Sequence, residues 1–190
     1  CKHKSVLGSS YTQKGRSGFR GKGSCLLHRK GEKQMQPLEL YIHIPFCVKK
    51  CAYCDFLSGP AGEKEKEEYV KMLVDEIRNC PDPVQNYRVI SIFFGGGTPS
   101  LLTGEQIGRL MDTVREIFTL DEDAEITMEM NPGTVTEEKL RKYRQAGVNR
   151  LSIGLQSVND EELRLLGRIH TYEEFREAYH LARANGFSNI

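Results

Sequence analysis

The sequence predicts an α/β fold in which parallel strands alternate with helices, forming an incomplete (β/α) barrel with about four strands. From residue 38 onward, short apolar runs alternate with long amphipathic segments, which is typical of repeated strand-helix units. The expected strands begin at residues 38, 89, 125 and 150, so each gap leaves room for a crossover helix. Right-handed crossovers would curl these strands into one wall of a barrel. At 190 residues, the chain is shorter than the roughly 250 residues of a complete eight-fold barrel.

Four short apolar runs are the expected strands of this sheet. They cover residues 38–44, 89–94, 125–130 and 150–155. Residues 188–190 resemble the opening of a fifth strand, and we expect the chain to stop in the middle of the fold.

Five amphipathic segments between the strands are the expected helices. They cover residues 63–79, 105–118, 137–146, 161–166 and 172–185. Thr103 and Thr171 each precede a Gln or Glu by three residues, which is the spacing of the capping box at a helix start. Gly147 and Gly186 stand where a helix commonly ends in a left-handed residue.

Residues 1–36 differ in composition from the rest of the chain. They carry nine Lys or Arg and a single acid, Glu32, for a balance of +8, whereas the remaining residues carry −7. Because this segment has no hydrophobic period, we expect a disordered basic head at 1–36 and the α/β domain at 37–190. Met35 precedes the first expected strand and suits an initiator, which favours translated upstream sequence or an artificial extension. An organelle transit peptide is the alternative, but the head shows little of the required amphipathic face.

The composition argues against several classes of protein. The acidic body lacks the basic face of a nucleic-acid-binding fold, and no run of 18 apolar residues exists that would span a membrane. The head also lacks the apolar stretch of a secretory signal. Six cysteines are too few for a disulfide scaffold, and three of them crowd into positions 47 to 54. This crowding is typical of metal ligation in a reducing compartment, so we expect a cytoplasmic protein.

Cys47, Cys51 and Cys54 directly follow the first expected strand with the spacing Cys-x3-Cys-x2-Cys. Thiolates are soft donors that bind iron–sulfur clusters or zinc. Zinc is the alternative reading, but a structural zinc site usually has four ligands, often on two separated knuckles. No second knuckle is present, because Cys80 lies far along the chain and Cys25 lies in the head. Three thiolates on a four-iron cluster would leave one iron for a small molecule with amino and carboxylate groups.

Glycine and polar residues stand at the ends of the next three expected strands, the edge where barrel enzymes place their functional groups. The glycines at 95–97 allow a ligand to approach the backbone, and their N–H groups can hold a carboxylate or hydroxyl. Glu129 interrupts an apolar strand near its end, and Gln156 repeats that placement one strand later. A tight turn or a solvated strand end would explain each alone, but their recurrence at successive strand ends favours one site.

Residues 41–56 closely resemble the cluster loop of radical S-adenosylmethionine (SAM) proteins of the coproporphyrinogen III oxidase-like group. The resemblance continues at residues 94–100, 128–133 and 149–157, in the family's order, and it spans residues 38–190. It implies the N-terminal part of a radical SAM core domain, with a 4Fe–4S cluster and SAM as cofactors. In that chemistry, one cluster electron cleaves SAM to methionine and a 5′-deoxyadenosyl radical.

The resemblance also implies roles for individual residues. The three cysteines would ligate the cluster, and no residue is assigned a catalytic role. Cofactor contacts fall on Tyr41, Tyr53, Gly96, Gly97, Thr98, Glu129, Gln156 and Arg168. The tyrosines would border the cluster and the SAM nucleoside, the glycines and the threonine would receive the methionine amino end, and the glutamate would bind SAM as well. Gln156 and Arg168 match positions that contact a second SAM in the oxidase branch, although Arg168 also suits an ordinary helix-end cation.

Two functions compete within the resembling group. Heme chaperones of the HemW family bind heme and deliver it to respiratory proteins, whereas the oxygen-independent oxidases decarboxylate coproporphyrinogen III in porphyrin biosynthesis. The oxidase branch carries another cysteine two positions past the third ligand, but Asp55 and Phe56 follow Cys54 here, as in the chaperone branch. The resemblance therefore favours a chaperone with heme or porphyrin as cargo and heme-accepting respiratory proteins as partners. A non-functional fragment is a third hypothesis, because an open wedge of four strands exposes apolar edges.

Overall fold

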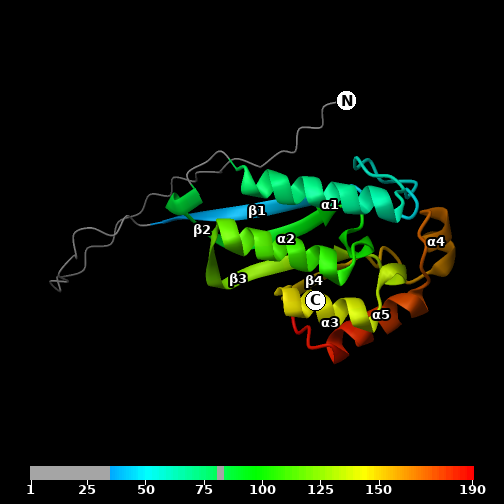
Figure 1. Cartoon of the computed structure of the whole chain (residues 1–190). Coiled ribbons are helices and arrows are strands. Elements are labelled where there is room, and N and C mark those ends of the chain that lie inside the picture. Colours follow the sequence, from blue (N-terminus) through cyan, green and yellow to red (C-terminus); the bar gives the residue numbers. More distant parts are fainter. Residues whose placement is uncertain (1–34, 81–83) are drawn as a thin grey trace, which may run out of the picture.

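The computed structural model describes residues 35–80 and 84–190, which form a four-stranded sheet with helices packed on one face (Figure 1). The strands run parallel in the order β1 (Gln36–Ile44), β2 (Tyr87–Gly96), β3 (Thr119–Met130) and β4 (Arg150–Ile153). The predicted α/β class with four parallel strands is therefore confirmed. The predicted disordered head at 1–36 lies outside the described residues except for its last two, of which Gln36 already pairs with Tyr87 in the sheet.

Five α-helices begin and end within one residue of their predicted bounds. They are α1 (Glu63–Arg78), α2 (Gly104–Ile117), α3 (Glu137–Ala146), α4 (Asp160–Leu165) and α5 (Tyr172–Ala184). Local signals explain this agreement, because Thr103 and Thr171 both form capping boxes. Gly147 and Gly186 have φ angles of 104° and 84°, the left-handed conformation that ends a helix without steric cost only at glycine.

Three short 3-10 helices escaped prediction. They are η1 (Val84–Asn86), η2 (Pro99–Leu101) and η3 (Pro132–Thr134). In η2 and η3, proline stands at the first position and sets a helical φ angle directly after β2 and β3. Both turns therefore leave the sheet at the same edge, where the strands end.

Strand β3 begins six residues earlier than predicted, at Thr119 instead of Glu125. Thr119 and Leu120 pair with β2, and the register then shifts, so that Glu125 pairs with Ser91. The residues between these two pairings include the polar sequence 121–123, which hides the strand from any search for an apolar run. Strand β4 is shorter than predicted and ends at Ile153.

The hydrophobic core fills the space between the sheet and helices α1, α2 and α3, which lie in front of the sheet in Figure 1. Alternate side chains of each strand point into this core, as the two-residue period of a strand requires. They include Leu40, Ile42, Ile44, Ile92, Phe94, Ile126, Met128, Met130 and Leu151. Each fully buried aliphatic side chain of this kind contributes about 1.5–3 kcal/mol to folding. The opposite face of the sheet carries the intervening residues, among them Tyr41, Phe93 and Glu129.

The outer edge of β4 is met by the last residues of the chain. Asn189 forms a parallel bridge with Arg150, and the Leu151 N–H donates to the Asn189 carbonyl oxygen at 3.1 Å. This agrees with the predicted opening of a fifth strand at residues 188–190. No helix among the described residues is both long and apolar enough to cross a membrane.

Candidate functional site

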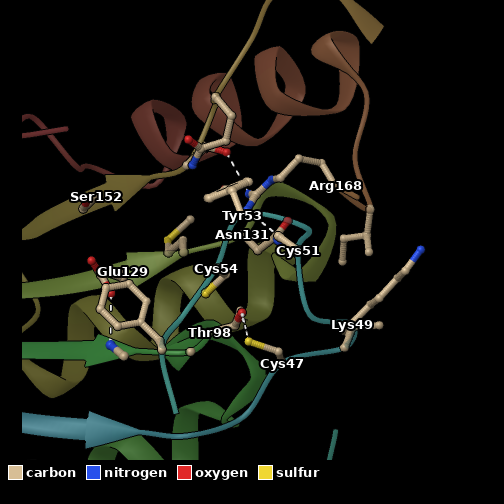
Figure 2. Close-up of a pocket in the computed structure, with 18 residues that line it drawn as sticks. Cys47, Lys49, Cys51, Tyr53, Cys54, Thr98, Glu129, Asn131, Ser152 and Arg168 are labelled. Carbon is tan, nitrogen blue, oxygen red and sulfur yellow. Dashed lines mark hydrogen bonds between the residues drawn. The ribbon is translucent and has the colours of Figure 1, made fainter. Parts of the chain in front are cut away.

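A cavity of about 250 Å³ lies at the edge of the sheet where the strands end (Figure 2). The loop after β1 forms one wall, and the ends of β2, β3 and β4 form the other. Every predicted site residue except Tyr41 lines this cavity, namely Cys47, Cys51, Cys54, Tyr53, Gly96, Gly97, Thr98, Glu129, Gln156 and Arg168. Residues from four separate strand ends thus converge on one space, as their placement in the sequence predicted.

The first wall is the cysteine loop, which we define as residues 45–59. Its ends are tied together, because the Cys47 N–H donates to the Gly59 carbonyl at 2.9 Å and the Gly59 N–H donates to the Pro45 carbonyl at 3.0 Å. In the middle, the Ala52 N–H donates to the Leu166 carbonyl at the end of α4, at 3.0 Å. All three cysteines of the loop are free and half-buried. The loop therefore presents three thiols to one cavity.

The glycines at the end of β2 bring backbone close to the loop. Gly96 has a φ angle of +112°, and a Cβ there would lie 2.5 Å from the His43 imidazole. A Cβ on Gly97 would lie 2.6 Å from the Phe46 carbonyl oxygen. The Gly97 N–H itself donates to the Ile44 carbonyl at 2.8 Å, so this amide is already engaged within the protein. Glycine is required here to let two backbone segments touch.

Glu129 extends from β3 into the cavity, and its carboxylate accepts a hydrogen bond from the Gly96 N–H at 3.1 Å. The predicted hydrogen bond from a glycine N–H to a carboxylate is therefore present, and this carboxylate belongs to the chain itself. Burial raises the pKa of Glu129 above its ordinary value, opposed by the Gly96 hydrogen bond and by the electrostatic effect of His43. A cationic amino group entering the cavity would relieve this burial cost.

A cluster of polar groups, some buried and some half-buried, joins η2 to η3, and we call it the strand-end network. Its members are Ser100, Asn131, Thr134, Lys139 and Tyr143. The Ser100 and Thr134 hydroxyls bond at 2.6 Å, and the Asn131 N–H donates to the Ser100 hydroxyl at 3.2 Å. Lys139 donates to the Ser100 carbonyl at 2.8 Å, while the Tyr143 hydroxyl donates to the Leu102 carbonyl at 2.6 Å. These bonds fix the turns that follow Thr98 and Glu129.

Gln156 and Arg168 meet above Gly154, just past the end of β4. A Cβ on Gly154 would lie 3.0 Å from the Gln156 amide nitrogen and 3.1 Å from the Arg168 guanidinium. Gln156 has a φ angle of 70°, which is uncommon for a residue other than glycine. Such conformations persist only where the surroundings impose them, and they gather at binding sites.

Tyr41 is the predicted site residue that does not line the cavity. Its ring stacks on Phe93 with centroids 6.1 Å apart, and its hydroxyl bonds to Nδ1 of His43 at 3.2 Å. His43 in turn contacts the Leu57 carbonyl of the cysteine loop at 3.4 Å. Tyr41 thus reaches the site through His43, whose imidazole lies between the Tyr41 hydroxyl and the cysteine loop.

Sequence reasoning missed Lys49 of the cysteine loop and two polar residues at the strand ends, Asn131 and Ser152. Ser152 pairs in register with Glu129 across the β3–β4 ladder, so its place followed from the strand alignment. Asn131 lies in the motif 128–133, in which the resemblance assigned a SAM contact to Glu129 alone. Both can present a hydrogen-bonding group to a polar ligand.

The chemistry of the donors fits an iron–sulfur cluster. The three thiols face one cavity, and two of them accept side-chain hydrogen bonds from Thr98 and Arg168. Within residues 35–80 and 84–190, no three His, Cys, Asp or Glu side chains converge closely enough to hold a single metal ion. This is compatible with a four-iron cluster, in which each thiolate binds a different iron.

Comparisons with known proteins agree with this reading of the site. A family model described as the Radical SAM superfamily matches residues 41–190. The chain is 49% identical over 158 residues to the heme chaperone HemW of Escherichia coli, covering 83% of this chain and 42% of that protein. It is 40% identical over 162 residues to the heme chaperone HemW of Haemophilus influenzae, with the same two coverages.

One solved structure also resembles the chain closely. Coproporphyrinogen III oxidase from Escherichia coli, described as a radical SAM enzyme, matches with a TM-score of 0.73 and 34% identity, covering 83% of this chain and 36% of that one. The chain therefore spans less than half the length of each of these three proteins.

Proposed function

The chain belongs to the radical SAM superfamily, and from this premise we propose that the whole protein is a heme chaperone that binds heme and transfers it to respiratory proteins. The identities of 49% and 40% to two bacterial heme chaperones support this proposal. Because the chain spans only 42% of each, heme binding and transfer are proposed for the whole protein and not for these residues alone. A cytoplasmic location is part of the proposal, since three free thiols in one loop require a reducing compartment.

Membership of this superfamily implies a 4Fe–4S cluster and SAM. We propose that Cys47, Cys51 and Cys54 ligate the cluster, which would supply the electron that cleaves SAM. The SAM contacts we propose are the cavity residues Tyr53, Gly96, Gly97, Thr98, Glu129, Gln156 and Arg168, together with Tyr41, which lies outside the cavity lining and bonds to His43. Glu129 offers its carboxylate to a cationic amino group, and Gly96 and Gly97 line the cavity beside it.

The residues after the third cysteine favour the chaperone over the oxidase, and our choice between the two functions rests on this observation. Asp55 and Phe56 stand where the oxidase branch has its additional cysteine two positions past the third ligand. The Phe56 side chain is 63% exposed and lines the cavity, so it places apolar surface at the mouth of the site. The oxidase remains the second candidate, because its solved structure matches with a TM-score of 0.73.

The test is anaerobic cluster reconstitution of the whole protein, followed by a heme titration and a coproporphyrinogen III turnover assay on the same sample. We expect heme to bind stoichiometrically, as read from its visible absorption, with no decarboxylated product. Decarboxylation accompanied by release of methionine would instead identify an oxidase. Failure to bind heme and failure to turn over porphyrin would together reject both functions.

A further inference from the structure

Two polar side chains donate hydrogen bonds to two of the three thiols of the cysteine loop. The Thr98 hydroxyl donates to Sγ of Cys47 at 3.6 Å, and Nη1 of Arg168 donates to Sγ of Cys51 at 3.7 Å (Figure 2). Cys54 receives no side-chain hydrogen bond from any residue that the structure describes. The three sulfur atoms therefore lie in unequal electrostatic surroundings.

The guanidinium of Arg168 is fixed from the side opposite the sulfur. Its Nη2 donates to the Gly154 carbonyl at 3.0 Å, and the Arg168 backbone N–H donates to the Leu163 carbonyl of α4 at 2.9 Å. Gly167, with a φ angle of +75°, makes the turn between α4 and this side chain. The Ala52 N–H of the cysteine loop donates to the Leu166 carbonyl at the end of the same helix. The Arg168 guanidinium and the Cys51 sulfur are therefore both positioned by α4.

The charge of Arg168 has no carboxylate partner. None of the ion pairs formed within the described part of the chain includes it. Its Nε is buried without a hydrogen-bond partner among the same residues. Arginine stays protonated at every pH at which proteins fold, so an unpaired cation is held against a thiol sulfur. Such an arrangement is stabilised when that sulfur carries the negative charge of a cluster ligand.

We infer that Arg168 is a positioning residue that acts through Cys51 and raises the reduction potential of the cluster. This inference rests on the proposed cluster. In the reduction step the cluster accepts one electron from an external reductant, no bond forms or breaks, and the net charge becomes more negative by one. A fixed cation and a hydrogen bond at a ligand sulfur stabilise the reduced form more than the oxidised form. Thr98 acts in the same direction on Cys47, but more weakly, because its donor is neutral.

This role differs from the SAM contact that the family resemblance implies for Arg168. Nη1 and Nη2 already engage Cys51 and Gly154, so the effect on the cluster exists before SAM binds. Lysine cannot reproduce it fully, because a single ammonium on a flexible stem lacks the planar fork that joins both acceptors. The reduction potential of the cluster, measured without SAM, therefore separates the effect of Arg168 on the cluster from its contact with SAM.

The experiment is a dithionite titration of the reconstituted whole protein without SAM, monitored by electron paramagnetic resonance of the reduced cluster. Arg168→Gln should move the midpoint to a more negative potential, and Arg168→Lys should move it less. Thr98→Val should shift it in the same direction. Arg164→Gln is the matched control, because Arg164 lies four residues earlier, in α4, with its side chain 74% exposed and paired with Glu161, and its variant should titrate like the wild type.

The outcomes distinguish this inference from the proposed function. A wild-type protein that takes up no cluster would remove the cofactor proposal itself. A cluster that forms normally in Arg168→Gln with an unchanged midpoint would overturn the inference, and so would a change confined to SAM affinity. If Arg168→Gln holds no iron, the midpoint potentials of Arg168→Lys and Thr98→Val decide instead. A shift to more negative potential in both variants supports the inference. Wild-type potentials in both variants reject it.

Discussion

The two walls of the cavity are built in different ways. The cysteine loop is held by main-chain hydrogen bonds at its ends and at Ala52, and its apolar side chains Val48, Phe56 and Leu57 are 54%, 63% and 73% exposed. The second wall, formed by the strand ends, is backed by the strand-end network, in which Asn131 lines the cavity and the fully buried Ser100 and Tyr143 lie behind it. The polar groups behind the strand ends bond to one another and to the main chain, whereas the cysteine loop presents its three thiols to the cavity.

This contrast between the two walls indicates which part of the site depends on the cofactor. Buried, mutually satisfied polar networks hold a unique arrangement, so the strand-end wall is formed before any ligand binds. Metal ligands close a loop and contribute their binding energy to its order. We therefore expect cluster loss to disorder the cysteine loop while the strand-end wall remains intact.

The largest expected effect comes from removing a thiol. Cys47→Ala should abolish cluster binding, because a 4Fe–4S cluster held by two thiolates loses one of its anchors. The unfolding free energy of the cluster-free protein should change by less than about 0.5 kcal/mol, since Cys47 is only half-buried and its bond to Gly59 is made by the main chain. Iron and sulfide content and thermal unfolding measure the two effects. Cys80→Ala, at a free cysteine outside the loop, should keep the cluster.

A second variant acts where the two walls touch. In Gly97→Ala, the new Cβ would meet the Phe46 carbonyl at 2.6 Å, and backbone on one side must move. We expect a loss of about 2–4 kcal/mol in unfolding free energy and at least a tenfold weaker affinity for SAM. Urea unfolding and calorimetric SAM titration measure these changes. Gly108→Ala, in α2 with open space at its Cβ, should instead stabilise the protein by about 0.5–1 kcal/mol.

A smaller loss should follow from breaking the strand-end network without changing its shape. Tyr143→Phe removes the hydroxyl that donates to the Leu102 carbonyl at 2.6 Å and leaves that carbonyl without this donor. The expected loss is about 1–3 kcal/mol in unfolding free energy, the usual penalty for a buried unsatisfied group. Tyr179→Phe is the control, because the Tyr179 hydroxyl makes no hydrogen bond with the described residues. Equal stability of the two variants would contradict a preformed wall.

The smallest expected effect concerns Glu129 and pH. Because burial raises the pKa of this carboxyl in the folded protein, folding takes up protons between its ordinary pKa and the raised value. The stabilisation of the protonated form is therefore complete below the ordinary pKa and is lost as pH rises through the raised pKa. Glu129→Gln should lack this loss, so the variant should gain in melting temperature relative to the wild type as pH rises from 4 to 8.

The same substitution should weaken SAM binding, because the neutral amide cannot attract a cationic amino group. Melting curves at several pH values and a SAM titration give both readouts. A melting difference that does not vary with pH would show that Glu129 is not held in a costly buried position.

Much of this architecture could be predicted because its signals are local. The capping residues Thr103 and Thr171 and the terminal glycines placed the helices within one residue of their observed bounds. The cysteine spacing and the glycines at 95–97 marked the cavity. The strand-end network could not be predicted, because Tyr143 reaches Leu102 across 41 positions and an amphipathic pattern identifies it only as a core residue. The engagement of the Gly96 amide by Glu129 was hidden for the same reason.

The contact between Arg168 and Cys51 spans 117 positions of the chain, and this separation bears on how the protein matures on the ribosome. At about 5–20 residues per second, translation makes the three thiols roughly 6–23 s before it makes Arg168. During that interval the nascent loop lacks its cationic neighbour and the α4 anchor at Ala52. Iron–sulfur delivery to the growing chain would thus meet unanchored thiols, open to oxidation or to the wrong metal. Cluster assembly is best timed after α4 has been synthesised and docked.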